Sequence, residues 1–232
     1  MQASASDPIQ TARLQAVLDN EAVFDLLRGV ALLTGSGVVA DLARTVVDAP
    51  RADLAIAFNH KQIASKLWLR DRLAATATAP LGRVLICGGW YAILSALLLD
   101  DGRLGVTHAV SLDLDAGCLP VAMALNRRHA EAGRFSAVTE DMYAFDYRTA
   151  LPFDWIVNTS CEHIGDLRAW LDRLPPAQSV VLQSNDYRRE PDHIACVDDL
   201  EAFKAQARLS AIHWQGELRQ RNYTRFMLIG RS

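Results

Sequence analysis

Apolar residues follow two different patterns along the chain, and the change comes near residue 80. Before that point they recur at roughly helical spacing, which predicts helices at about 14–27, 38–47 and 55–77. Along the last of these, the polar side chains gather largely on one side. After residue 82, short continuous apolar runs alternate with helical segments. The chain is therefore predicted to have a helical N-terminal part and an α/β remainder.

The α/β part is predicted to form a mostly parallel sheet with helices on both faces. Predicted strands lie at 83–88, 108–115, 135–141, 153–160 and 179–185, and predicted helices at 91–100, 117–132, 166–174 and 197–207. Two final runs, 209–218 and 223–230, are suited to antiparallel pairing. Continuous apolar strands alternating with helices are typical of a sheet covered on both faces. In such sheets, ligands bind at the carboxyl ends of the strands.

A glycine pair, Gly88-Gly89, follows the first predicted strand and precedes a helix. Glycine allows a ligand to approach the backbone closely, and the N-terminus of the following helix favours negative charge. A simple strand-to-helix turn explains the pair equally well. The glycine pair therefore indicates a ligand site only in combination with the residues at the ends of the other strands.

Acidic residues end the next two predicted strands. Asp113 ends the second strand, where a carboxylate can accept hydrogen bonds from both hydroxyls of a ribose. Asp115, slightly further on, is the alternative and also suits a helix cap. Asp141 and Met142 end the third strand, where they suit the amino group and ring of an adenine, or form an ordinary loop. The order of these groups on successive strands is more specific than any one of them.

The ends of the fourth and fifth predicted strands are unusually polar. They read NTSCEH and QSNDY, and they contain Asn158, Ser160 and Tyr187. Such side chains can orient an amine by hydrogen bonding. Buried polar clusters are costly unless they bind something, which argues against a purely structural role.

Two other interpretations of these strand ends were weighed. Cys161, His163, His193 and Cys196 have the number of ligands that zinc requires, but not a recognised spacing. Cys161 and His163 also suggest a nucleophilic pair, although no oxyanion-stabilising device is evident. Alternatively, Glu162 and His163 cap the following helix. We expect packing and capping roles for Cys161 and His163, and no bound metal.

The ordered motifs CGGW, SLDLD and TEDMY resemble those of the class I S-adenosylmethionine (SAM)-dependent methyltransferases, over about residues 80–232. The resemblance implies a Rossmann-like, seven-stranded, mostly parallel sheet with an antiparallel last strand. It also implies a SAM-binding domain at 81–232 and an N-terminal helical lid at 1–80. The family's glycine loop is closer to GxGxG, so the bulky residues after Gly89 are a departure. The residues expected to bind SAM are Gly88, Gly89, Tyr91, Asp113, Asp141, Met142 and Thr159.

A narrower resemblance points to a specific reaction. NTSCEH together with QSNDY looks like the small bacterial enzymes of this fold that cyclise SAM to azetidine-2-carboxylic acid and release methylthioadenosine. This resemblance implies catalytic roles for Asn158, Ser160 and Tyr187, which would orient the amine of SAM. The alternative is a methyltransferase that acts on a small molecule.

Two further classes of function remain open. A nucleotide-dependent oxidoreductase would also use Asp113 for a ribose, but the GxGxxG motif and a Tyr-x-x-x-Lys pair are missing. A non-catalytic binding protein that retains the fold is the third class. The polar strand ends favour the enzyme.

Composition narrows the expected partners. The formal net charge is −3, which argues against a nucleic-acid partner. No apolar run is long enough to span a bilayer, and the N-terminus shows no secretory pattern. The four cysteines are widely spread, as is typical of reduced thiols in the cytoplasm. We therefore expect a cytoplasmic enzyme with a small-molecule substrate; the sequence does not indicate an oligomeric state.

Overall fold

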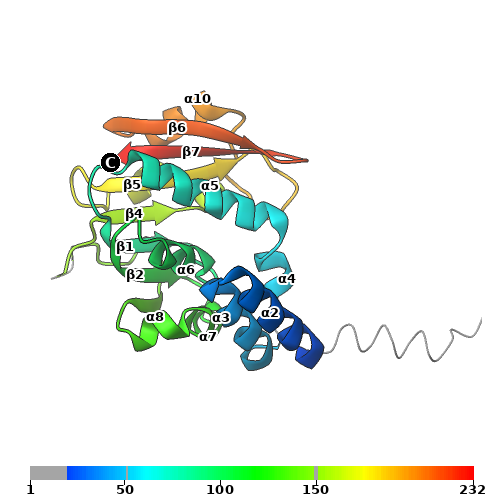
Figure 1. The fold of residues 1–232 in the computed structure, drawn as a ribbon. Coiled ribbons are helices and arrows are strands. Elements are labelled where there is room, and N and C mark those ends of the chain that lie inside the picture. Colours follow the sequence, from blue (N-terminus) through cyan, green and yellow to red (C-terminus); the bar gives the residue numbers. More distant parts are fainter. Residues whose placement is uncertain (1–19, 51, 149–150) are drawn as a thin grey trace, which may run out of the picture.

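A seven-stranded sheet forms the centre of the protein, in the order β3-β2-β1-β4-β5-β7-β6 (Figure 1). The computed structural model describes residues 20–50, 52–148 and 151–232, so the first 19 residues of the predicted lid lie outside the described residues. The strands are β1 (Gly82–Cys87), β2 (Val106–Asp113), β3 (Phe135–Thr139), β4 (Trp155–Asn158), β5 (Ser179–Asn185), β6 (Ala211–Arg219) and β7 (Thr224–Arg231).

The directions of the strands confirm the predicted fold class. Strands β1 to β5 pair in parallel, whereas β7 runs antiparallel to both β5 and β6. The order reverses beside β1, since β2 lies on one side of it and β4 on the other. In open sheets this switch point is where the crevice for a ligand forms.

Helices cover both faces of the sheet, whereas α2 packs on α3. The helices of the described residues are α2 (Asn20–Thr34), α3 (Gly37–Asp48), α4 (Leu54–Ala57), α5 (His60–Thr76), α6 (Ile93–Asp100), α7 (Cys118–Leu125), α8 (Arg127–Glu131), α9 (Leu167–Leu171) and α10 (Leu200–Ala207), with the 3-10 turn η1 (Cys161–His163). Along β1, Val84 and Ile86 join the core on one face, and Leu85 and Cys87 join the core on the other. This alternation explains why the strand is a continuous apolar run.

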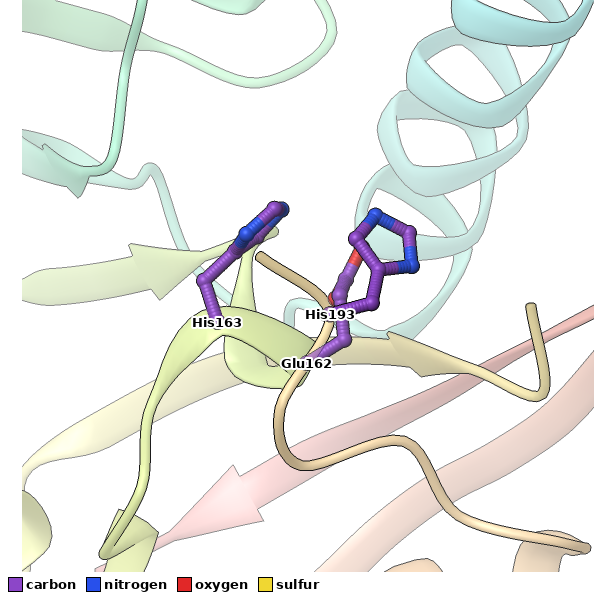
Figure 2. Close-up of side chains that lie close together, drawn as sticks. All are labelled: Glu162, His163 and His193. Atoms are coloured by element: carbon purple, nitrogen blue, oxygen red, sulfur yellow. The ribbon is translucent and has the colours of Figure 1, made fainter. Parts of the chain in front are cut away.

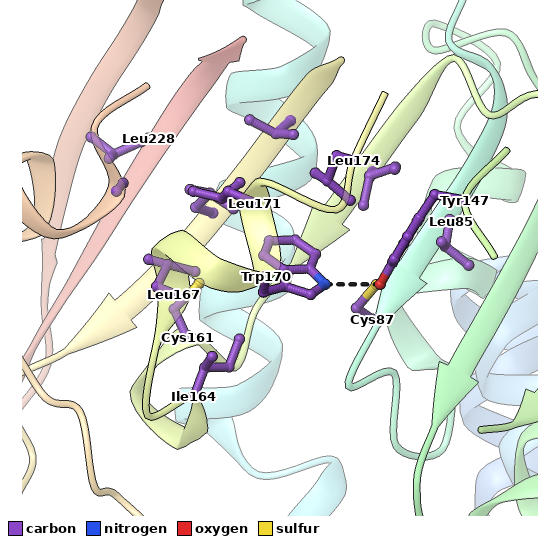
Figure 3. Packing of buried hydrophobic residues seen from close by; sticks show 14 of the residues in the cluster. Leu85, Cys87, Tyr147, Cys161, Ile164, Leu167, Trp170, Leu171, Leu174 and Leu228 are labelled. Atoms are coloured by element: carbon purple, nitrogen blue, oxygen red, sulfur yellow. Dashed lines mark hydrogen bonds between the residues drawn. The ribbon is translucent and has the colours of Figure 1, made fainter. Parts of the chain in front are cut away.

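The core beneath α9 contains a buried polar contact among apolar side chains (Figure 3). The indole N–H of Trp170 donates to the hydroxyl of Tyr147 at 2.8 Å, and that hydroxyl donates to the carbonyl of Met142 at 2.7 Å. The indole N–H of Trp170 and the hydroxyl of Tyr147 therefore both have a hydrogen-bond partner, as burial favours. The contact also fixes the segment that follows β3.

The long helix predicted at 55–77 is two helices in the structure. Asp53 caps α4 by accepting from the backbone N–H of Ile56, and Asn59 caps α5 by accepting from Gln62. Side chains of this kind satisfy the free N–H groups of a new first turn, so Asn59 starts a second helix. The prediction of one helix at 117–132 is also wrong, because α7 and α8 meet at the buried Asn126. The side chain of Asn126 does not cap α8 but donates to the carbonyl oxygens of Ala92 and Ala122.

Helix α5 packs against the sheet as part of its cover. Leu69 and Leu73 are fully buried in the same core as Val84 of β1. The start of α5, by contrast, extends to the carboxyl ends of the strands (Figure 1). The division into a lid at 1–80 and a catalytic domain at 81–232 stays a prediction.

Candidate functional site

A cleft of about 860 Å³ lies at the carboxyl ends of the strands, closed on one side by α4 and the start of α5. Its walls bring together residues from β1, β2, β5 and the segments after β3 and β4, which are far apart in the sequence. Such a volume is ordinary for a small-molecule site. Of the predicted site residues, those lining the cleft are Gly88, Gly89, Tyr91, Asp113, Asp141, Met142, Thr159, Ser160 and Tyr187.

Asn158 differs from the other predicted site residues, because it does not line the cleft. Its side chain is fully buried at the end of β4. The amide oxygen accepts from the backbone N–H of Ser160 at 2.9 Å, and the amide nitrogen faces the sulfur of Met142 at 3.6 Å. Asn158 therefore holds two lining residues in place from behind.

The loop after β1 has an unusual backbone. Gly88, Trp90 and Ala92 all have positive φ angles, of 61°, 49° and 56°. For Trp90 and Ala92 this conformation is costly, and such strain clusters at functional sites. At Gly89 an added Cβ would lie 2.0 Å from the hydroxyl of Ser111, so only glycine fits there. The bulky residues that depart from the family's loop are thus accommodated by local strain.

Asp113 closes this loop from β2. One carboxylate oxygen accepts from the backbone N–H of Trp90 at 2.7 Å, and the other accepts from the N–H of Asp115 at 3.0 Å. Asp115 instead accepts from the N–H of Gly117 at the start of α7, at 2.8 Å. The N-cap of α7 is Gly117 and no side chain caps this helix, so the capping alternative for Asp115 is not confirmed. Asp113 is partly exposed and keeps unused acceptor positions towards the cleft.

The adenine-side candidates lie in the loop after β3. Asp141 accepts from the backbone N–H of Tyr143 at 2.8 Å, which fixes the turn. Met142 is half-buried beside the amide of Asn158. The loop therefore presents an acidic and an apolar side chain on the same wall of the cleft.

A buried ion pair that the sequence analysis missed lies beneath the ends of β4 and β5. Glu162 and Arg225 are 3.3 Å apart and both are buried. Asn185 donates to the same oxygen of Glu162 at 2.6 Å, and Arg225 donates to the carbonyl of Thr159. The register of β5 with β7 places Arg225 opposite Asn185, a long-range pairing that the sequence pattern does not give.

Lys66 of α5 is a second lining residue that the sequence analysis did not single out. Its ammonium group donates to the side chain of Gln62 at 2.7 Å. Burial, and then the positive charge of Arg225, lower the pKa of Lys66 to about 7. A substantial fraction of this lysine is therefore neutral near physiological pH, when it can accept a proton. The one-sided polar face predicted for the helix was the available signal.

The structure does not support the nucleophilic pair of Cys161 and His163. Cys161 is fully buried, and its thiol faces the carbonyl of Asn158 at 3.7 Å. Burial raises the pKa of this thiol well above its ordinary value, so a thiolate is disfavoured. The ring of His163 faces Asp192 instead. For the same reason the proposed set of two cysteines and two histidines does not form a zinc site.

The capping alternative for Glu162 and His163 is also wrong. Asp166 caps α9 by accepting from the backbone N–H of Ala169 at 2.9 Å. Glu162 is instead bound to Asn185 and Arg225. Both residues line the cleft.

Comparisons with known proteins agree with this architecture. No protein-family model and no curated protein matches the sequence. Among solved structures, the [4+2]-cyclase SpnF is similar with a TM-score of 0.58 and 13% identity, over 84% of this chain and 92% of SpnF. The fold is that of the SAM-dependent methyltransferases.

Two further structures show the same fold. The N-methyltransferase NodS from Bradyrhizobium japonicum WM9, in complex with S-adenosyl-L-homocysteine, has a TM-score of 0.54 and 14% identity, over 82% of this chain and 96% of NodS. A possible exported protein from Bordetella parapertussis has a TM-score of 0.54 and 16% identity, and covers 98% of this chain and 100% of its own. At these identities the methyltransferase fold is shared, whereas activities differ among the proteins that have it.

Within the described residues, no helix combines the length and the apolar character that crossing a membrane requires.

Proposed function

We propose that the protein is an enzyme that uses SAM, bound across the ends of β1, β2 and β4. The observation that carries this proposal is the convergence of Gly88, Asp113 and Met142 on one cleft, in the order in which a methyltransferase fold contacts SAM. Asp113 would accept from the ribose hydroxyls, and the loop after β3 would contact the adenine. The methionine part would then extend towards Ser160 and Tyr187.

The reaction we propose is the cyclisation of SAM to azetidine-2-carboxylic acid. The neutral α-amine attacks the γ-carbon, the bond between that carbon and sulfur breaks, and sulfur leaves with the electron pair as methylthioadenosine. The main task of the enzyme is to fold the amine back towards this carbon. Ser160 and Tyr187 supply hydrogen-bonding groups on the wall where the amine would lie.

Lys66 suits the proton transfer that this reaction needs. The α-amine is an ammonium group in solution and must lose a proton before it can attack. A lysine with a pKa of about 7 is neutral often enough to accept that proton directly or through one water. Lys66 lines the same cleft and has no carboxylate partner among the ion pairs of the described residues. It is the group to which we assign the role of base.

Methyl transfer to a small molecule is the second candidate, and the size of the cleft favours it. A volume of about 860 Å³ leaves room for an acceptor beside SAM. Lys66 would then deprotonate the acceptor.

The cyclisation candidate has support from the comparisons instead. The similarity to a protein named as a [4+2]-cyclase supports the view that this fold also serves reactions other than methyl transfer.

The products distinguish the two candidates. Purified protein incubated with SAM alone is expected to release methylthioadenosine and azetidine-2-carboxylic acid in equal amounts, measured by mass spectrometry. Formation of S-adenosylhomocysteine, only when a small-molecule acceptor is added, would replace cyclisation with methyl transfer. Absence of SAM binding in calorimetry would contradict both candidates.

A further inference from the structure

Three side chains at the mouth of the cleft have the composition of a metal site: Glu162, His163 and His193 (Figure 2). One carboxylate oxygen and one ring nitrogen of each histidine lie within 4.8 Å of one another. Glu162 and His163 come from η1 after β4, and His193 comes from the segment between β5 and α10. Two histidines and one carboxylate are a ligand set that divalent transition metals use.

The hydrogen bonds of the histidines leave one nitrogen of each ring available. Nδ1 of His163 lies 3.1 Å from the carbonyl oxygen of Asp192 and 3.2 Å from its carboxylate. Nδ1 of His193 lies 2.5 Å from the carbonyl oxygen of Tyr187. Since a carbonyl oxygen only accepts, Nδ1 must carry the proton in both rings. In the neutral rings the lone pair is then on Nε2, which is the usual arrangement for histidine ligands of metals.

Glu162 provides an independent sign that this cluster suits a cation. One of its oxygens accepts from Asn185 and Arg225, but the other is buried and has no hydrogen-bond partner. A buried carboxylate oxygen without a partner is expensive. Arg225 does not satisfy this second oxygen, because it donates to the oxygen that already accepts from Asn185. A metal ion between Glu162 and the two histidines would satisfy the free oxygen.

We propose that Glu162, His163 and His193 bind one divalent transition-metal ion, with Zn²⁺ as the best-suited ion. Bonds of ~2.0–2.2 Å to nitrogen and oxygen would require the three ligand atoms to move closer together by about an ångström. His163 and His193 lie on short segments outside the sheet, which makes such an adjustment feasible. This assignment departs from the expectation that no metal is bound.

The location of the ion indicates which substrate groups it would bind. All three residues line the same cleft as Tyr187, so the coordination positions that the protein leaves open would face the interior of this cleft. An open zinc site binds oxygen or nitrogen atoms and polarises them. The ion is therefore placed to hold a carboxylate, hydroxyl or amine of the substrate. This consequence rests on the proposed function, whereas metal binding itself does not.

Metal binding can be tested without measuring activity. The full chain, first dialysed against a chelator, is titrated with Zn²⁺ in calorimetry and, after desalting, analysed by mass spectrometry for metal content. We expect about one Zn²⁺ per chain, with Mg²⁺ binding far more weakly because imidazole suits zinc. The double variant His163→Ala/His193→Ala is expected to lose at least ~100-fold in affinity, since even outer-shell changes cost 10–100-fold.

The matched control is His213→Ala, which removes an exposed histidine of β6 at the far edge of the sheet. It is expected to bind Zn²⁺ as the unchanged protein does. Equal Zn²⁺ affinity in the double variant, or no stoichiometric binding by the unchanged protein, would overturn the proposal. SAM binding is measured on the same samples without metal, so a failure of the metal site is distinguishable from a failure of the proposed function.

Discussion

The amide oxygen of Asn158 accepts a hydrogen bond from the backbone N–H of Ser160 at 2.9 Å. The contact joins the end of β4 to Ser160, which lines the cleft. Because Asn158 is fully buried and Ser160 is not, the buried residue determines the position of the exposed one. We therefore treat Asn158 as a positioning residue and Ser160 as the group that meets the substrate.

Replacing Asn158 with alanine is expected to lower both stability and turnover. The N–H of Ser160 would lose its partner, which costs ~1–3 kcal/mol when the group stays buried. Urea unfolding measures the first effect, and release of methylthioadenosine from SAM measures the second. Asn158→Asp keeps an acceptor oxygen and should recover part of the turnover. If Asn158→Ala turns over SAM at the unchanged rate, the positioning role is wrong.

Asp113→Ala is expected to weaken SAM binding by ~10–100-fold. Hydrogen bonds to a charged acceptor contribute ~1.5–3 kcal/mol, which corresponds to this range of affinity. The matched control is Asp115→Ala, because Asp115 is a neighbouring aspartate whose carboxylate accepts from the N–H of Gly117 at the start of α7. Calorimetry with SAM should show the larger loss for Asp113. A larger loss for Asp115 would move the ribose contact to that residue.

The sequence pattern was informative where contacts depend on strand order alone. Parallel strands bring their carboxyl ends to one edge, so Gly88, Asp113 and Tyr187 could be placed in one cleft before any distances were known. Glu162 and Arg225 could not be paired in this way. Their contact depends on the antiparallel register of β7 and on the turn η1, which are set by packing across the whole sheet.

Helix boundaries also limit which site residues the sequence can predict. The polar face of 55–77 was visible in the sequence, yet Lys66 was not distinguished from its polar neighbours. Which of them faces the cleft depends on where Asn59 starts α5 and on how that helix packs on the sheet. The cap at Asn59 is a local feature, but packing in the folded protein decides whether the chain starts a new helix there or continues the previous one.

Gly88→Ala is expected to reduce SAM turnover more than its effect on stability explains. Gly88 has a φ of +61°, and an added Cβ would lie 3.0 Å from the hydroxyl of Ser160. Gly133→Ala is the matched control, because Gly133 has a φ of +67° but nothing within 4 Å of the added atom. Both variants should lose roughly 1 kcal/mol from the strained backbone.

The difference between the two glycine variants separates an effect on the cleft from a general effect on stability. Urea unfolding should show similar losses, whereas methylthioadenosine release should fall only for Gly88→Ala. Equal turnover in the two variants would mean that the contact between Gly88 and Ser160 has no part in SAM use. This outcome would also weaken the assignment of the glycine loop.

Lys66→Met is expected to stabilise the protein most strongly at low pH. Because the pKa of Lys66 is lowered to about 7 from its ordinary value of 10.5, the unfolded chain binds more protons than the folded protein between these two pKa values. Folded-state stability therefore rises with pH across this window, and the cost of burying the charge is fully present below about pH 7. Methionine removes the charge and keeps the apolar stem, so the gain, at most ~5 kcal/mol near pH 6, should shrink as the pH rises towards 10.

The same variant tests the role of Lys66 as a base. For the unchanged protein, turnover of SAM should rise with pH through about 7, because the neutral amine is the active form. Lys66→Met should lose this rise together with most of the rate. Lys204→Met, which removes an exposed ion pair with Glu201 on α10, should change neither the pH profile nor the stability by more than ~0.5 kcal/mol. A Lys66→Met enzyme that keeps the pH profile would assign the proton transfer to another group in the cleft.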